Sequence, residues 1–197
     1  MKSKQAQFGL AVIAIIVIVI GLGVVSQKTQ KPGKYDNFAK ALKDGGAQFY
    51  GAFWCTHCQA QEKEFEMTRQ KLESIGLYKE CSNPDQSLTP ICKEKKIESY
   101  PTWMFKDGIT LKNVSKPVVC KVNPKHEVIP SEPSQCIPQM TSAYYKTYIF
   151  PEYKFSIKSE ADPVVKDGVW KFGIPSETTG ELPLDFLANQ ISYTLPQ

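Results

Sequence analysis

The chain has 197 residues, a formal net charge of +4, 42% hydrophobic residues and six cysteines. This length suits one domain of ordinary size with appendages. All five lysines before residue 35 flank one apolar segment, and the rest of the chain holds 19 basic and 20 acidic residues. This near-neutral balance excludes the basic surface on which nucleic-acid binding depends, so we expect no nucleic-acid partner.

The first predicted element is an apolar helix over residues 8–25, a run without a charged residue. Such a run is about 27 Å long as a helix, close to the ~30 Å hydrocarbon core of a bilayer. No small-residue cleavage motif follows it, which favours an uncleaved signal anchor over a cleaved signal peptide. We therefore predict a membrane anchor over 1–27 and a polar linker over 28–34.

The even number of cysteines is typical of an oxidising compartment, where disulfides persist. We expect a single-pass protein of the cytoplasmic membrane, with the domain over 35–197 on the extracytoplasmic side.

Residue patterns in that domain predict the following elements in chain order: a helix over 35–43, a strand over 47–53, a helix over 59–75 that ends at Gly76, a strand over 77–80, a turn over 83–85, a helix that starts at Thr89-Pro90, a strand over 98–105, a loop over 176–180 and a closing helix over 182–191. Helices and strands alternate in the first half, which indicates an α/β fold.

Two cysteines separated by two residues, Cys55 and Cys58, lie where the predicted strand gives way to the helix. Only a thiolate attacks a disulfide, and a helix N-terminus stabilises a sulfur anion. His57 adds a hydrogen-bond donor or a positive charge beside it. We therefore predict that Cys55 is the attacking thiol and that Cys58, one turn further in, is the buried resolving thiol.

A zinc site and an inert bridge are the alternative interpretations of this pair. Zinc requires about four ligands in compact pairs. The other cysteines form no second pair of this spacing, and the two histidines are not spaced as ligands. Redox chemistry is therefore favoured, and neither a metal nor a cofactor is predicted.

The remaining cysteines are expected to form disulfides. A bridge between Cys81 and Cys92 would pin a helix to a strand end and contribute ~2–4 kcal/mol. It is either a static staple or a second redox pair that exchanges electrons with the first, and the sequence leaves both open. Cys120 and Cys136 are expected to pair because the proline-rich stretch around them has few other means of holding its shape.

These motifs together resemble a known family. Phe53-Trp54-Cys55, Cys58, the helix that follows and Tyr100-Pro101-Thr102 resemble a thioredoxin fold of the disulfide oxidoreductase kind. The longer run from Tyr50 to Gln61, with Glu80-Cys81-Ser82, Cys92-Lys93-Glu94 and Tyr100-Pro101-Thr102-Trp103, is similar to the thioredoxin-like domain fused to bacterial vitamin K epoxide reductase homologues.

The resemblance implies a substrate site and partners. Pro101 would be a cis-proline facing the cysteine pair, and Trp54, Thr56 and Tyr100 would contact the substrate beside it. The substrates would be unfolded or thiol-containing secreted proteins. Since the fused membrane domain is absent here, the electron acceptor would be a separate membrane quinone reductase of the vitamin K epoxide reductase or a similar type.

One strand position departs from the family. Phe49 stands where thioredoxins and some relatives hold a buried acid for proton transfer. Glu62 or Glu64 is the candidate substitute.

A repeated tripeptide predicts an insertion. Lys-Asp-Gly occurs at 106–108 and again at 166–168, and joining the chain there gives a β-hairpin with an Asp-Gly turn between 98–105 and 169–173. Residues 108–167 would then be inserted at the tip of the C-terminal hairpin. A chance repeat is the alternative, since Lys-Asp-Gly also occurs at 43–45.

Six aromatic residues gather within this insertion, and they form either its own small core or a docking face for a partner. They are Tyr144, Tyr145, Tyr148, Phe150, Tyr153 and Phe155.

The sequence therefore predicts a thioredoxin-like domain with one N-terminal transmembrane helix, which oxidises dithiols of secreted proteins through Cys55 and Cys58. A thiol reductase of the same compartment is the nearest alternative. A partner-binding module whose cysteine pair stays locked is another.

Overall fold

The computed structural model describes residues 32–112, 114–120, 146–150, 152–153 and 155–197. The predicted anchor over 1–27 lies outside these residues. No helix within the described ranges is long and apolar enough to cross a membrane. Residues 33–197 form one compact unit.

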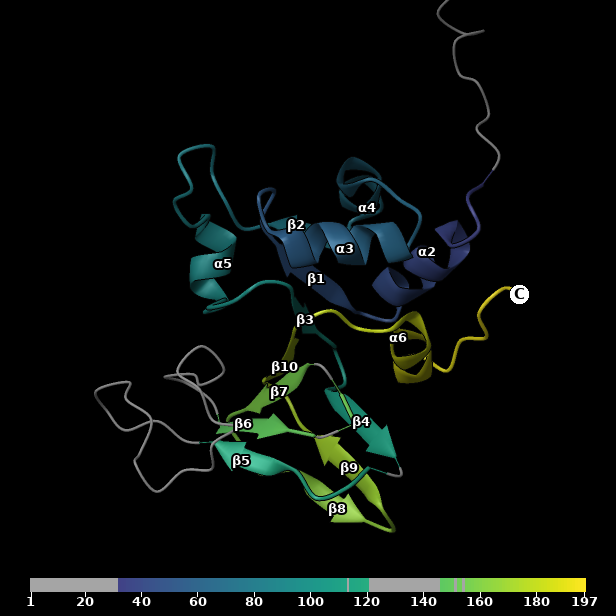
Figure 1. The fold of residues 1–197 in the computed structure, drawn as a ribbon, viewed down its shortest axis with the longest axis vertical. Helices are drawn as coiled ribbons and strands as arrows, with labels where there is room; N and C mark the ends of the chain where they lie inside the picture. The colour runs from purple at the N-terminus through teal and green to yellow at the C-terminus, as the bar shows by residue number, and fades with distance from the viewer. Residues whose placement is uncertain (1–31, 113, 121–145, 151, 154) are drawn as a thin grey trace, which may run out of the picture. The chain divides into compact units, whose positions relative to one another are not determined.

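Five helices and ten strands follow one another along the described part of the chain (Figure 1). They are α2 (Asp36–Asp44), β1 (Gln48–Gly51), α3 (Thr56–Glu64), α4 (Arg69–Ile75), β2 (Tyr78–Glu80), α5 (Pro90–Glu94), β3 (Thr102–Met104), β4 (Ile109–Lys112), β5 (Val118–Cys120), β6 (Lys146–Ile149), β7 (Ser156–Ser159), β8 (Val164–Lys166), β9 (Val169–Phe172), β10 (Ser176–Thr179) and α6 (Leu184–Gln190).

The central sheet has seven strands in the order β2-β1-β3-β10-β7-β6-β5. Strand β1 runs parallel to β2 and antiparallel to β3, and β3 runs antiparallel to β10. With α2 before β1, helices on both sides of β2 and α6 after β10, this arrangement is mixed α/β and consistent with a thioredoxin-like fold.

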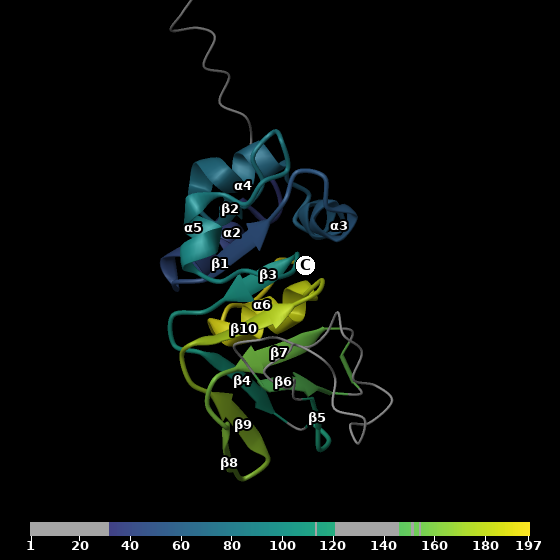
Figure 2. The same ribbon diagram turned by 90° about the vertical axis from the view of Figure 1, so that its left-hand side faces the viewer.

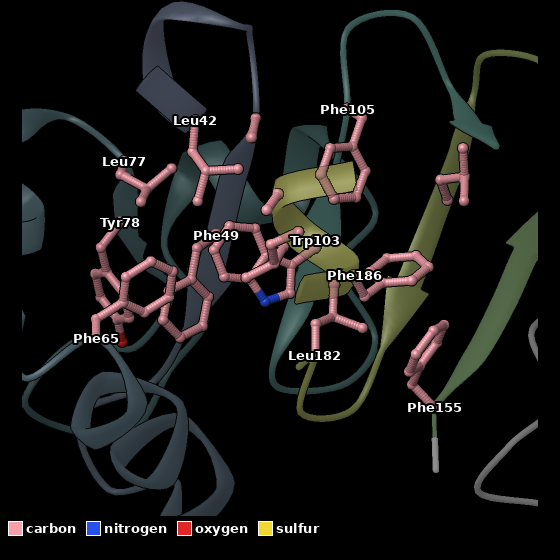
Figure 3. Packing of buried hydrophobic residues seen from close by; sticks show 14 of the residues in the cluster. Leu42, Phe49, Phe65, Leu77, Tyr78, Trp103, Phe105, Phe155, Leu182 and Phe186 are labelled. Carbon is pink, nitrogen blue, oxygen red and sulfur yellow. The ribbon is translucent and has the colours of Figure 1, made fainter. Parts of the chain in front are cut away.

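The two faces of the sheet bury different residues because successive side chains of a strand point to opposite faces. Phe49 of β1 stacks on Trp103 of β3 with ring centroids 4.8 Å apart, in a core that includes Phe65 (Figure 3). Tyr50, the next residue of β1, packs instead with the Cys81–Cys92 disulfide. The redox turn therefore follows a strand that is packed on both faces.

The helix predicted over 59–75 is wrong as one element, because the structure divides it into α3 and α4. Glu66 has a φ of +53°, a left-handed conformation that an α-helix cannot continue through. The Thr68 hydroxyl then accepts a hydrogen bond from the Lys71 N–H and caps the start of α4. The predicted end of the helix is confirmed, since Gly76 is left-handed with a φ of +85°.

The predicted C-terminal hairpin is wrong in its partner strand. Strand β3 pairs with β10, in the segment expected to be a loop over 176–180, with Thr178 opposite Trp103. Strand β9 pairs instead with β4 and β8 in a separate three-stranded sheet. Asp167-Gly168 does form a two-residue hairpin turn with both φ values positive, but it joins β8 to β9.

Strands β4 to β9 lie between β3 and β10 in the chain and enlarge the fold in two ways. Strands β7, β6 and β5 continue the central sheet beyond β10, and β4, β9 and β8 form the second sheet. Both views show β8 and β9 at the opposite end of this unit from α3 and α4 (Figures 1 and 2).

Tyr148, Phe150 and Phe155 are buried in the main core, and Tyr153 is partly buried against it. Phe150 makes T-shaped contacts with Trp170 and Phe172, and Phe155 packs against Phe186 of α6 with ring centroids 4.7 Å apart. Tyr144 and Tyr145 lie outside the described residues. The inserted strands therefore share one hydrophobic core with the rest of the domain.

Candidate active site

The redox turn lies between β1 and α3. Cys55 occupies the N-cap position of α3, and its Sγ accepts a hydrogen bond from the Cys58 N–H at 3.1 Å. The sulfur takes the place of the side-chain oxygen that ordinarily caps a helix. Both thiols are free, with Cys55 6% exposed and Cys58 fully buried.

The surroundings shift the pKa values of the two thiols in opposite directions. The hydrogen bond from the Cys58 side chain and the backbone N–H groups of the first turn lower the pKa of Cys55 to about 7. The same side-chain contact and burial raise the pKa of the Cys58 thiol well above its ordinary value. At neutral pH the outer sulfur is therefore partly thiolate while the inner sulfur stays protonated.

His57 is exposed and lies beside an acid that no motif in the sequence indicated. Its Nδ1 is 2.7 Å from Glu181 Oε1, in the segment before α6. This hydrogen bond raises the pKa of His57 and so favours its positive charge. Of the interactions that lower the pKa of Cys55, the charge of His57 is the smallest, and the His57 backbone N–H contributes more. The helix start therefore tunes Cys55 more than the imidazole does.

The four residues expected to contact substrate lie around the turn. Trp54 is 46% exposed, donates a hydrogen bond from Nε1 to Ser82 Oγ and makes a T-shaped contact with Tyr100. Thr56 is exposed at the start of α3. The Tyr100–Pro101 peptide bond is cis, as the resemblance implied. The ring contact brings the proline segment next to the redox turn.

The backbone of Phe53, two residues before Cys55, is fixed at both of its polar groups. Its N–H donates to Glu80 Oε1 at 3.1 Å, and its C=O accepts from Arg69 Nη2 and Gln59 Nε2, each at 3.1 Å. No motif in the sequence marked Arg69 or Glu80 as site residues. They reach the turn only because α4 and β2 pack beside it.

The two candidate acids on α3 lie in different surroundings. Glu62 is almost buried, accepts a hydrogen bond from Arg69 Nε at 3.1 Å and contributes to the raised pKa of Cys58. Glu64 is exposed, and desolvation followed by the charge of Glu181 raises its pKa. Of the two, Glu62 is the one that acts on the resolving thiol.

The other cysteines lie away from the helix start. Cys81 and Cys92 form the predicted disulfide, and both residues are fully buried. Cys120 is buried at the end of β5. Its predicted partner Cys136 lies outside the described residues, so that pairing stays a prediction.

Comparison with known proteins agrees with the geometry of the turn. A stretch of 72 residues is 33% identical to thiol-disulfide oxidoreductase LTO1 of Arabidopsis thaliana and covers 36% of this chain and 19% of that protein. A stretch of 115 residues is 32% identical to protein disulfide-isomerase of Humicola insolens and covers 57% of this chain and 21% of that protein.

Both relatives support a thioredoxin-like oxidoreductase. The chain spans about a fifth of the length of these curated relatives. No protein-family model matches it.

Proposed function

We propose that the protein is a thiol–disulfide oxidoreductase that acts through Cys55 and Cys58 on proteins outside the cytoplasm. The observation that carries this proposal is the opposite placement of the two free thiols. Cys55 lies at the start of α3, where its thiolate is stabilised, and Cys58 lies behind it, buried and protonated. A mixed-disulfide mechanism requires a nucleophile nearer the surface than the resolving thiol, and Cys55 at 6% exposure meets this beside the fully buried Cys58.

In dithiol oxidation, a substrate thiolate forms a bond with Cys55 Sγ of the oxidised pair. The Cys55–Cys58 bond breaks, and its electron pair stays on Cys58, which takes up a proton. The second substrate thiolate then attacks the substrate sulfur of the mixed disulfide and releases Cys55 as a thiolate. Disulfide reduction follows the same steps in reverse. Exposed Trp54 and the Tyr100–Pro101 segment would hold the substrate beside Cys55.

The sequence favours the oxidising direction, and one observation makes a reductase the second candidate. A pKa of about 7 for Cys55 is close to the ~7 of thioredoxin and far above the ~3.5 of a strong periplasmic oxidant. An equilibrium titration of the Cys55–Cys58 pair against glutathione distinguishes the two. A potential near ~ −120 mV would identify an oxidase, and one near ~ −270 mV a reductase.

The exchange mechanism itself is tested with two cysteine variants. Cys58→Ser should accumulate mixed disulfides with extracytoplasmic proteins because the resolving sulfur is gone, and Cys55→Ser should accumulate none. A binding module whose cysteine pair stays locked predicts the opposite outcome, with partner binding unchanged in Cys55→Ser.

The proposal has three further parts. Residues 8–25 anchor the chain in the membrane, the domain lies on the extracytoplasmic side, and a separate membrane quinone reductase accepts the electrons. The length and apolar composition of residues 8–25 support the anchor. Membrane fractionation of the full chain, followed by protease treatment of intact spheroplasts, tests both points. A chain in the soluble fraction, or a domain that only lysis exposes to protease, would contradict the anchor or its orientation.

A further inference from the structure

Cys58 must exchange a proton in a place that water does not reach. Its sulfur leaves with an electron pair in one direction of the reaction and attacks in the other, so it gains or loses a proton in each cycle. The residue is fully buried, and its contact with Cys55 and its burial both disfavour the thiolate. Phe49, at the strand position where thioredoxins hold an acid, offers only a hydrocarbon ring.

The Tyr78 hydroxyl and the buried Cys58 sulfur border the same space beside Gly51. Strands β1 and β2 are parallel with Phe49 opposite Tyr78, so the Tyr78 side chain lies on the same face as Phe49 and Gly51. Tyr78 Oη is 2.8 Å and Cys58 Sγ 3.0 Å from the point that a Cβ on Gly51 would occupy. The missing side chain of Gly51 is therefore the space in which the hydroxyl and the sulfur converge.

The Tyr78 ring is fixed in this position by its neighbours. Phe49 makes a T-shaped contact with it, with ring centroids 4.8 Å apart, and the Arg69 guanidinium lies 6.0 Å from its centroid. Figure 3 labels both Phe49 and Tyr78. Burial raises the pKa of the Tyr78 hydroxyl, and the nearby charges of Glu80 and Cys58 raise it further. The hydroxyl therefore stays protonated and can pass a proton on while receiving another.

Glu80 connects this hydroxyl to the solvent. Tyr78 Oη donates to Glu80 Oε2 at 3.4 Å, while Glu80 Oε1 accepts from the backbone N–H groups of Phe53 and Ser82. The second carboxylate oxygen therefore has two neighbours, the tyrosine hydroxyl and Arg69 Nη1, which lies 3.8 Å away. The Glu80 side chain is 26% exposed, so its carboxylate can exchange protons with water.

We propose that the Tyr78 hydroxyl and the Glu80 carboxylate carry protons between Cys58 and the solvent, a role that rests on the proposed function of the cysteine pair. When Cys58 attacks a mixed disulfide on Cys55, its proton passes to Tyr78 Oη as the hydroxyl proton passes to Glu80 Oε2. The Cys58–Cys55 bond forms, the bond from Cys55 to the substrate sulfur breaks, and the electron pair leaves on that sulfur. In the opposite direction the same groups return a proton to the departing Cys58.

The other charged and titratable groups around the pair come from α3, α4 and the proline segment. They are Glu62, Arg69, Tyr100 and Cys55. Glu62 is the competing proton acceptor because it lies one helical turn after Cys58. Arg69 pairs with both acids, through Nε with Glu62 Oε1 at 3.1 Å and through Nη1 with Glu80 Oε2 at 3.8 Å. A test must therefore separate Tyr78 and Glu80 from Glu62.

The test uses the full-length chain in detergent, with Cys55 and Cys58 reduced, and the chromogenic disulfide dithiobis-nitrobenzoate as the probe. Attack by Cys55 releases a first thionitrobenzoate, and attack by Cys58 on the resulting mixed disulfide releases a second. We expect Tyr78→Phe and Glu80→Gln to slow the second release about 10²-fold at neutral pH. In Tyr78→Phe the first release should be unchanged, and the deficit should shrink at alkaline pH, where hydroxide can take the proton.

The matched control is Tyr148→Phe, which also removes a tyrosine hydroxyl bonded to a carboxylate, that of Asp162. It should leave both releases at wild-type rates. A second release at the wild-type rate in Tyr78→Phe would overturn the relay. So would a second release that is slow in Glu62→Gln but not in Tyr78→Phe or Glu80→Gln. A chain that gives no first release would instead contradict the proposed function. A purely structural role of Tyr78 predicts lower unfolding stability without a change in the pH profile or solvent isotope effect of the second release.

Discussion

The reactivity of Cys55 depends mainly on the Cys58 thiol and the backbone N–H groups at the start of α3. Its sulfur caps α3 and accepts a hydrogen bond from the Cys58 N–H, and the Cys58 thiol is the largest influence on its pKa. His57, the neighbour that the sequence made conspicuous, points its ring at Glu181. The thiolate is thus stabilised by groups that any residue at position 57 would leave in place.

We predict that alkylation of Cys55 by iodoacetamide follows the thiolate fraction and is lost as the pH falls through about 7. Cys58→Ala removes the side-chain donor, so the pH midpoint of Cys55 alkylation should rise toward the ordinary value for a cysteine. Cys58→Ser keeps a hydroxyl donor and should move it less. Rates measured by mass spectrometry across the pH range give the three midpoints, and identical midpoints would show that the side-chain hydrogen bond has no influence.

At the scale of elements, an ion pair joins the inserted strand β7 to β10. Lys158 Nζ lies 3.8 Å from Glu177 Oε1 and from Glu98 Oε2, and both Lys158 and Glu177 are buried. Lys158 also donates to Ser99 Oγ, just before the Tyr100–Pro101 segment. Burial raises the pKa of Glu177 to about 7, although the charge of Lys158 acts to lower it.

We predict that Lys158→Met destabilises the protein by about 3 kcal/mol at pH 8 because it leaves a buried carboxylate without its partner. A carboxyl whose pKa is raised on folding stabilises the fold below its ordinary value and loses that contribution as the pH rises through about 7. Without Lys158 this pKa rises further, so the deficit relative to wild type should be smaller at pH 6 than at pH 8. Urea unfolding of wild type and Lys158→Met at pH 6 and pH 8 measures this difference in stability.

The control for this prediction is Lys146→Met, on the neighbouring strand β6. Lys146 pairs with the exposed carboxylate of Asp162, so its loss should cost no more than about 1 kcal/mol at either pH. Equal deficits at pH 6 and pH 8 in Lys158→Met would mean that Glu177 does not titrate in this range.

For the whole molecule, local signals predicted the part of the fold that carries the site. The apolar run before Cys55, the glycine after Ile75 and Thr89-Pro90 are short-range features, and each marks a boundary that the structure contains. The pairing of β3 with β10 was not predictable because it joins strands about 75 positions apart. Strand β10 is also short and polar, so its sequence is typical of a loop.

Within the site too, local features were predictable from the sequence and long-range contacts were not. The cysteine spacing and the Tyr100–Pro101 bond are visible in the sequence. The roles of Arg69, Glu80 and Glu181 depend on which elements pack beside the turn, and a single chain carries no local sign of that. Tyr78 is an ordinary strand residue in the sequence, and its proposed role depends on Gly51, whose missing side chain leaves room for the hydroxyl.

We predict that the domain unfolds as one unit because the insertion and the redox half share a core. Phe155→Ala should lower the free energy of unfolding by ~3–5 kcal/mol, since Phe155 is buried against Tyr153 and Phe186. Tryptophan fluorescence and far-UV circular dichroism should give coincident urea transitions in wild type and variant. Separate transitions would show that the inserted strands fold independently.

The pairing of β10 on both sides has a consequence for the edges of the sheet. Strand β10 is hydrogen-bonded to β3 and to β7. Without the inserted strands it would be an open edge, with a row of unpaired backbone groups onto which another polypeptide could add. With β7, β6 and β5 beyond β10, the edge of the sheet is β5, five places from the strand that leads into Cys55. A polypeptide that approaches the redox turn thus meets no open strand edge at β10.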